Sequence, residues 1–261
     1  MMSTKYDSKY VNRIINGTLI GVTDDLNVYK DYCVSSFDRV YNDFTFIKKI
    51  CNKEMKVLDI GATPPLLICM LKDAGYDNLT ILDPFSDKFH IFCENNNIAK
   101  YQLALTDKPL ELDLKYDFIN MSEVFEHVNY NKIMMIGQVK SLLTQNGLLH
   151  LTTPNLRSFW GLYSLIVKNG GLASKPAGSV YEQYDRQSSA YGYYGHLREY
   201  TSKEIIQFFE QCGFEKKLTQ GIFCDMSTNR TNNKFINKFI STLELAFPNW
   251  RVFHRYFFQI K

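Results

Sequence analysis

The chain has 261 residues, a formal net charge of +3 and six cysteines. Its length suits one large domain, or a core with a cap, and is enough to bury a real core. The charge is too small to indicate a nucleic-acid partner, because a dedicated binder usually carries a dense basic stripe. The cysteines form no CxxC pair and indicate a reducing compartment. With neither an apolar leader nor a run of about 18 apolar residues, the sequence predicts a cytoplasmic protein without a membrane span.

Helical segments precede the first strong strand. Within residues 1–50, apolar side chains recur at helix-like spacing, first around Tyr10 and Ile14 and later around Phe37 and Tyr41. We therefore expect residues 1–50 to form an N-terminal helical cap.

Short apolar strands then alternate with helices. The expected strands are 56–60, 79–82, 117–121 and 148–152, and the expected helices are 65–74, 89–95 and 124–143. Asn146 and Gly147 are expected to turn the chain into the last of these strands. Such alternation is typical of a parallel sheet with helices on both faces. The sequence therefore predicts an α/β fold with a doubly wound, mostly parallel seven-stranded sheet, whose ligand-binding core covers residues 51–155.

The alternation breaks at residues 156–200, which are rich in Gly, Ser and Tyr. A long segment without regular structure inside a compact domain is usually functional, so we expect a Tyr-rich insertion that acts as a lid. Residues 201–261 are expected to complete the sheet. Thr201 is expected to cap a helix over 203–211, followed by a strand near 217–223, a helix near 234–246 and a strand over 256–260.

Basic residues gather toward the end of the chain. Residues 226–261 hold six Lys or Arg and one Glu. This charge is compatible with contact to an anionic surface, although a solvated face on a packed helix is the commoner explanation. Both alternatives stay open.

The first two predicted strands end in a pattern that favours a nucleotide-like ligand. Asp59 and Gly61 stand at the end of the first strand, and Asp83 follows the second. Glycine lets the backbone approach a ligand closely, and an acid after the second strand accepts hydrogen bonds from ribose hydroxyls. Doubly wound folds bind their ligands at this edge of the sheet.

Several stretches of the chain form a series of motifs: VLDIGA, ILD, YDFINMSEVFEHV, LLTQNGLLHLTTPN and, later, HLREYTSKEIIQFFEQCGF. In this order they resemble the motifs of class I S-adenosylmethionine-dependent methyltransferases. The resemblance implies a Rossmann-like core and S-adenosylmethionine as the methyl donor. The contacts that it implies for the donor are Asp59, Gly61, Ala62, Asp83, Leu105, Thr106 and Ser122.

One position departs from that family. Where a second glycine is usual, this chain continues Ala62-Thr63-Pro64-Pro65. The prolines remove backbone N–H donors at the start of the helix. A pyrophosphate needs those donors, whereas S-adenosylmethionine has no phosphate. The departure therefore weighs against a dinucleotide-dependent dehydrogenase more than against a methyltransferase.

Acidic and histidine side chains follow the 117–121 strand. Glu123, Glu126 and His127 stand at i, i+3 and i+4, so a helical turn there would place all three on one face. Methyl transfer to oxygen or nitrogen needs alignment and a base for the acceptor proton. His127 suits the role of base, and Glu126 and His196 are further catalytic candidates.

The same side chains also suit a divalent ion. Glu123, Glu126, His127 and His196 offer mixed oxygen and nitrogen ligands, which favour Mn²⁺ or Fe²⁺ over Mg²⁺. The small-RNA 2′-O-methyltransferases resemble this pattern, with ExxEH and a later His. In those enzymes the metal binds the acceptor hydroxyls and lowers their pKa. A metal-free histidine base and a metal site both stay open.

The predicted insertion and its end supply candidate acceptor contacts at Tyr193, Tyr194 and Arg198. Tyrosine rings suit a sugar and arginine suits a phosphate or carboxylate, although a self-packed loop is equally compatible. EVxEHV and HxREYT resemble bacterial sugar and capsular-polysaccharide O-methyltransferases, which implies a small, sugar-like or sugar-nucleotide-like acceptor. The alternatives are a metal-assisted RNA 2′-O-methyltransferase and a catalytically silent binding protein, which the intact cofactor pattern speaks against.

Overall fold

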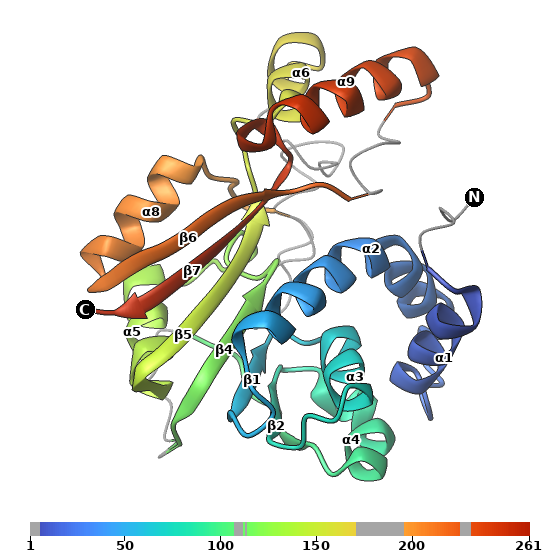
Figure 1. Ribbon diagram of the computed structural model, residues 1–261, viewed down its shortest axis with the longest axis vertical. Coiled ribbons are helices and arrows are strands. Elements are labelled where there is room, and N and C mark those ends of the chain that lie inside the picture. Colours follow the sequence, from blue (N-terminus) through green and yellow to red (C-terminus); the bar gives the residue numbers. More distant parts are fainter. Residues whose placement is uncertain (1–5, 107–111, 113, 171–195, 225–230) are drawn as a thin grey trace. The chain divides into compact units, whose positions relative to one another are not determined.

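The computed structural model describes residues 6–106, 112, 114–170, 196–224 and 231–261 (Figure 1). The chain divides into two compact units, one up to Leu103 and the other from Ala104. None of the helices in the described ranges is long and apolar enough to cross a membrane.

The first unit joins two N-terminal helices to a small parallel sheet. Its elements are α1 (Ser8–Thr18), α2 (Leu26–Ile50), β1 (Val57–Ile60), α3 (Leu66–Asp73), β2 (Leu79–Leu82), a 3-10 turn (Ser86–Phe89), α4 (His90–Asn96) and β3 (Ala99–Tyr101). β1 and β2 are buried at every position and pair in parallel, and β3 pairs in parallel with β2. This burial on both faces explains why their sequences are mostly apolar.

The second unit carries the remaining four strands. Its elements are β4 (Tyr116–Ser122), α5 (Lys132–Leu142), β5 (Leu143–Pro154), α6 (Phe159–Val167), α8 (Ser202–Gln211), β6 (Phe214–Ile222), α9 (Lys234–Ala246), a 3-10 turn (Pro248–Trp250) and β7 (Phe253–Ile260). β4 and β5 are parallel, whereas β7 runs antiparallel to both β5 and β6. α6 and α9 pack together at one end of this unit (Figure 1).

The seven strands have the order β3-β2-β1-β4-β5-β7-β6. Three of the described pairings are parallel and two, both at the end of the chain, are antiparallel. The predicted α/β fold with a mostly parallel seven-stranded sheet is therefore confirmed.

Two local predictions in the second unit are wrong. The helix expected over 124–143 begins only at Lys132, where the Asn131 side chain accepts hydrogen bonds from the next N–H groups, and residues 123–131 form a turn instead. Glu123 has φ of +56°, which ends the strand in a left-handed conformation that no helix continues. The Asn146-Gly147 turn is absent because β5 runs through it, with an irregular register opposite Tyr116.

The segment expected to lack regular structure starts with a helix. α6 is nine residues long, and the side chain of Ser158 accepts a hydrogen bond from the N–H of Gly161 to cap it. Residues 171–195, which hold most of the expected lid, lie outside the described residues.

Candidate functional site

The first unit brings two predicted cofactor residues to the ends of neighbouring strands. Asp59 lies in β1 and Asp83 directly follows β2, and their side chains are 4% and 3% exposed. Gly61 has φ of +74°, which a residue with a side chain rarely adopts, and its N–H donates to the carbonyl of Leu82. Ala62, beside it, is buried. The chain therefore turns sharply away from β1 at Gly61.

The chemistry of Asp83 fits a ligand with hydroxyl donors. Its Oδ1 accepts a hydrogen bond of 2.7 Å from the N–H of Phe85. Burial raises the pKa of this carboxyl, and that backbone hydrogen bond offsets part of the rise. A buried carboxylate gains most from additional donors, and the two ribose hydroxyls of S-adenosylmethionine are such donors.

Three further residues predicted to contact the cofactor lie in the second unit. Leu105 is buried, and the carbonyl of Thr106 accepts a hydrogen bond from the side chain of Gln138 at 2.9 Å. The hydroxyl of Ser122, at the end of β4, donates to Oδ1 of Asn120 at 2.9 Å. Their contact with the cofactor stays a prediction.

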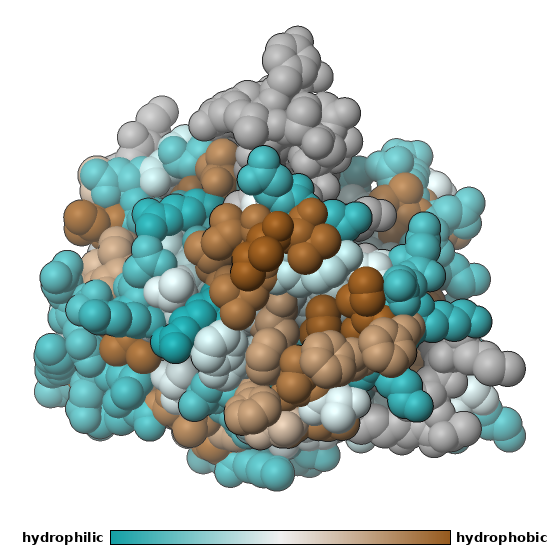
Figure 2. All heavy atoms as spheres, turned by 90° about the horizontal axis from the view of Figure 1, so that it is seen from above, coloured by the Kyte–Doolittle hydropathy of each residue, from teal (hydrophilic) through white to brown (hydrophobic). Residues whose placement is uncertain are grey.

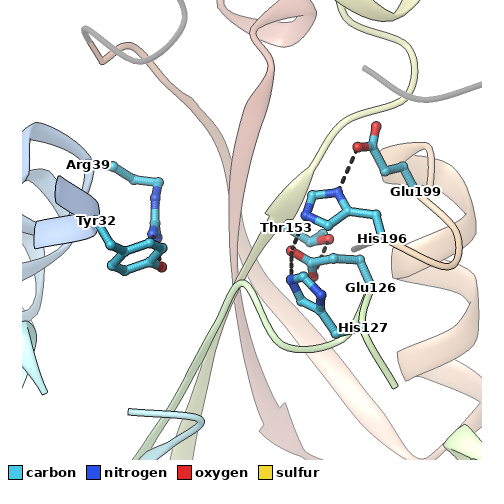
Figure 3. A network of polar contacts seen from close by, with 7 residues as sticks. All are labelled: Tyr32, Arg39, Glu126, His127, Thr153, His196 and Glu199. Carbon is cyan, nitrogen blue, oxygen red and sulfur yellow. Dashed lines mark hydrogen bonds and ion pairs between the residues drawn. The ribbon is translucent and has the colours of Figure 1, made fainter. Parts of the chain in front are cut away.

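The second unit also gathers the predicted catalytic residues around one buried carboxylate (Figure 3). Glu126 is fully buried and lies in the turn after β4. Its Oε2 accepts a hydrogen bond of 3.0 Å from the hydroxyl of Thr153 on β5. Its Oε1 lies 3.9 Å from Nε2 of His127 and 3.9 Å from Nε2 of His196. The two imidazole rings meet edge to face, with centroids 4.7 Å apart.

Backbone contacts explain how residues far apart in sequence meet here. The N–H of Glu123 donates to the carbonyl of Thr152, and its left-handed backbone then starts the turn that carries Glu126. The N–H of Leu197 donates to the carbonyl of Glu126 at 3.0 Å, which holds the segment with His196 against the turn. Nδ1 of His196 lies 2.8 Å from Oε1 of the buried Glu199, so its Nε2 faces Glu126.

The electrostatics of this cluster follow from its burial. Burial raises the pKa of Glu126, and the charge of His196 opposes the rise. Burial alone would lower the pKa of His196, but the hydrogen bond with Glu199 and the charge of Glu126 outweigh it, so the net shift is upward. The pKa values of both side chains are therefore raised, that of the carboxyl by burial and that of the imidazole by its acidic neighbours.

Three of the four residues predicted as metal ligands come together. One ligand atom each from Glu126, His127 and His196 lies within 4.8 Å of the others. Glu123 is not in this group. The predicted helix would have put it on the same face as Glu126 and His127, but residues 123–131 form a turn instead. Sequence reasoning missed Thr153 and Glu199, which orient the cluster. The HLREYT motif contained Glu199, but its role depends on a contact that spacing alone does not reveal.

Of the predicted acceptor residues, Arg198 is described and Tyr193 and Tyr194 lie outside the described residues. The guanidinium of Arg198 lies 4.8 Å from the centre of the Tyr200 ring and pairs with Oε1 of Glu204 at 2.5 Å. It borders a cavity of about 380 Å³. The cavity is lined by residues of the turn, α5, the segment before α8 and α8 itself, and it combines rings, two cationic groups, one carboxylate and amides: Phe125, Lys132, Arg198, Tyr200, Glu204, Ile205, Gln207, Phe208 and Gln211.

A methyltransferase domain family matches residues 37–218, which include both sites. The chain belongs to this family. It is therefore an S-adenosylmethionine-dependent methyltransferase, and S-adenosylmethionine is its methyl donor.

Similar proteins agree with this family. A ubiquinone biosynthesis O-methyltransferase from Rickettsia typhi is 25% identical over 140 residues, which cover 52% of this chain and 53% of the relative. The methyltransferase thus spans about half the length of this curated relative. The structure of a SAM-dependent methyltransferase from Thermotoga maritima has a TM-score of 0.56 and 14% identity, covering 95% of this chain and 98% of the other. The small RNA methyltransferase HEN1 has a TM-score of 0.56 and 15% identity, covering 87% of this chain and 25% of the other. The two structural likenesses show the fold alone.

Proposed function

We propose that this methyltransferase transfers the methyl group to a hydroxyl oxygen of a small acceptor, with His127 as the base. The observation that carries the proposal is the pair of imidazoles on one buried carboxylate, each with Nε2 3.9 Å from Oε1 of Glu126. A buried carboxylate stabilises the imidazolium that forms when a histidine takes a proton. Oxygen as the acceptor atom is supported by the relative from Rickettsia typhi, which is an O-methyltransferase.

Each group has a defined part in the proposed reaction. S-adenosylmethionine supplies the methyl group. Asp59, Gly61 and Asp83 of the first unit hold the donor. The acceptor oxygen forms the new bond to the methyl carbon as the carbon–sulfur bond breaks, and the hydroxyl proton passes to Nε2 of His127. Glu126 stabilises the resulting positive charge.

For the acceptor class we propose a sugar or sugar-nucleotide-like molecule that occupies the cavity beside Arg198. The cavity combines rings, on which a sugar or base can stack, with the cationic side chains of Arg198 and Lys132. Burial lowers the pKa of Lys132 to about 8, so a bound anion would stabilise its charged form. An anionic, ring-bearing acceptor matches the rings and Lys132, and its anionic group would share Arg198 with Glu204.

A panel of acceptors with radiolabelled S-adenosylmethionine tests the proposal. We expect label transfer to sugar nucleotides, and a KM raised about tenfold or more by Arg198→Ala, since one charge-assisted hydrogen bond contributes about 1.5–3 kcal/mol. Lys203→Ala, on the exposed side of α8, is the matched control and should leave KM unchanged. Transfer only to polyprenyl phenols would reject the sugar-like acceptor, and transfer only to amines would reject O-methylation.

A second candidate, metal-assisted methylation of RNA 2′-hydroxyls, is favoured by one observation. The cluster of Glu126, His127 and His196 has the donor set and spacing of a divalent-metal site, and Glu199 orients one imidazole as outer partners of metal ligands do. Elemental analysis after Mn²⁺ loading, compared between the wild type and Glu126→Gln, tests this. One equivalent of Mn²⁺ in the wild type and none in the variant, with RNA methylation that requires it, would replace the histidine-base proposal.

A further inference from the structure

α6 and α9 expose large apolar side chains that the proposed methyl transfer does not use. On one side α6 packs into the core, where Trp160 joins a cluster with Ile240 of α9. At its end, however, Leu165, Ile166 and Val167 are 61%, 77% and 60% exposed. Three consecutive exposed aliphatic residues are unusual on the surface of a soluble domain.

α9 also exposes large apolar side chains. Asn237 and Ile240 face inward, whereas Phe235 and Phe239 are 79% and 56% exposed. The two phenylalanines are four residues apart and therefore lie on one face of the helix. Figure 2 is seen from the side on which α6 and α9 are drawn in Figure 1, and it shows hydrophobic side chains gathered on that face. We call Leu165, Ile166, Val167, Phe235 and Phe239 the α6–α9 patch.

The charges around the patch determine what fits it. Lys168 follows α6, and Lys234 and Lys238 lie on α9; all three are exposed. The acidic side chain of α9, Glu244, is instead buried, where its Oε1 accepts a hydrogen bond from the N–H of Val252. Among the described residues of these two helices, the exposed charges are therefore all positive. A second copy of the same patch would bring lysines against lysines, whereas an anionic surface complements them.

We propose that the α6–α9 patch docks the protein on the surface of a membrane that contains anionic phospholipids. Phenylalanine and aliphatic side chains beside lysines are the composition of a helix that lies in the lipid interface. In this arrangement the five apolar side chains enter the region between headgroups and acyl chains, while the three lysines meet lipid phosphates. Two residues of the basic stretch noted in the sequence, Lys234 and Lys238, thus have a partner, and the proposal is independent of the identity of the methyl acceptor.

Sedimentation of the full chain with vesicles tests this. We expect binding to vesicles that contain phosphatidylglycerol and much weaker binding to pure phosphatidylcholine. The double change Phe235→Ser and Phe239→Ser should weaken binding by about tenfold or more per phenylalanine. Lys234→Ala and Lys238→Ala should each weaken it about fivefold, from about 1 kcal/mol per lysine near an anionic surface. Ile133→Ser and Met134→Ser on α5, whose side chains are 65% and 48% exposed, are the matched control and should bind as the wild type.

Two measurements keep the proposal falsifiable. All the altered side chains are exposed, so each variant is expected to fold. Circular dichroism and S-adenosylmethionine binding check this. Sedimentation equilibrium measures self-association. No binding to anionic vesicles, or equal loss in the α5 control, would overturn the proposal. A wild-type dimer that Phe235→Ser and Phe239→Ser convert to a monomer, without vesicle binding, would show that the patch joins two copies instead.

Discussion

At the scale of single residues, Asp83 offers the most direct test of cofactor binding. Its carboxylate is buried at the end of β2 and already accepts one backbone hydrogen bond. Asp83→Asn keeps the shape of the side chain but removes the negative charge that strengthens its hydrogen bonds with the ribose hydroxyls. We expect the Kd for S-adenosylmethionine to rise about 10- to 100-fold. Calorimetric titration measures it, with Asp77→Asn, a carboxylate 80% exposed, as the matched control. Unchanged affinity in Asp83→Asn would show that the donor binds elsewhere.

His127 should affect turnover without affecting donor binding. It lies in the turn with Glu126 and is about a third exposed, at 29% of its side chain. Because it acts on the acceptor proton, we expect His127→Ala to lower kcat about 10²- to 10⁴-fold and to leave the Kd for S-adenosylmethionine unchanged. His90→Ala, an exposed histidine of α4, should change neither quantity. Full turnover in His127→Ala would mean that another group is the base.

The residues of the site show what a sequence can indicate. Asp59, Gly61 and Asp83 were predicted because each stands at a fixed place relative to a strand end, and the structure places them there. Glu126 and His127 do lie together as predicted, but for another local reason, since a turn, not a helix, carries them. Glu199 was missed because its role is a contact with His196 in a segment without helical periodicity.

At the scale of elements, the start of α8 is the best-defined local structure. The hydroxyl of Thr201 accepts a hydrogen bond from the N–H of Glu204, and the side chain of Glu204 accepts one from the N–H of Thr201 at 2.8 Å. This capping box satisfies two N–H groups that a helix start leaves unpaired. It also fixes the chain directly after His196 and Glu199.

Removing that cap should destabilise the protein measurably. We expect Thr201→Ala to lower the free energy of unfolding by about 1 kcal/mol, whereas Thr201→Ser keeps the hydroxyl and most of the stability. Urea denaturation followed by tryptophan fluorescence reports on the second unit, which holds both tryptophans, Trp160 and Trp250. Thr242→Ala on exposed α9 is the control. Equal stability of all three variants and the wild type would remove the capping argument.

Helices and strands were predicted correctly where the apolar spacing and the capping residues indicated the same element. α9 occupies the predicted residues because Asn233 caps it and its apolar residues recur at helical spacing. β3 was missed because Ala99–Tyr101 is a short edge strand without an apolar run. The helix predicted over 124–143 was given too early a start, because the apolar residues before α5 lie in a turn, where Phe125 packs against Tyr200 and Phe209. Tertiary packing, not helix formation, explains those apolar side chains.

At the scale of the whole molecule, strand alternation was sufficient to predict the fold class, because parallel strands buried on both faces have a distinctive sequence. The antiparallel end of the sheet was predicted less fully, since the pairing of β7 with β5 depends on contacts between residues far apart in sequence, such as Leu148 with Gln259. One buried network joins these distant parts. His254 of β7 lies with Nδ1 2.6 Å from the hydroxyl of Ser202 on α8, and with Nε2 3.4 Å from the side chain of Asn155 after β5.

This network should make the stability of the second unit depend on pH. Burial, with the nearby charge of Arg251, lowers the pKa of His254 to about 4 from an ordinary value of 6.5. As the pH falls from 6.5 to 4, the unfolded chain binds a proton that the folded chain refuses, so stability is lost over this window, by up to about 3 kcal/mol. Urea denaturation at several pH values measures this. His254→Gln should be less stable than the wild type at pH 7.5 but should lose less of its free energy of unfolding on acidification. His90→Gln, which alters an exposed histidine, should follow the wild type. Parallel curves for His254→Gln and the wild type would mean that folding does not lower the pKa of His254.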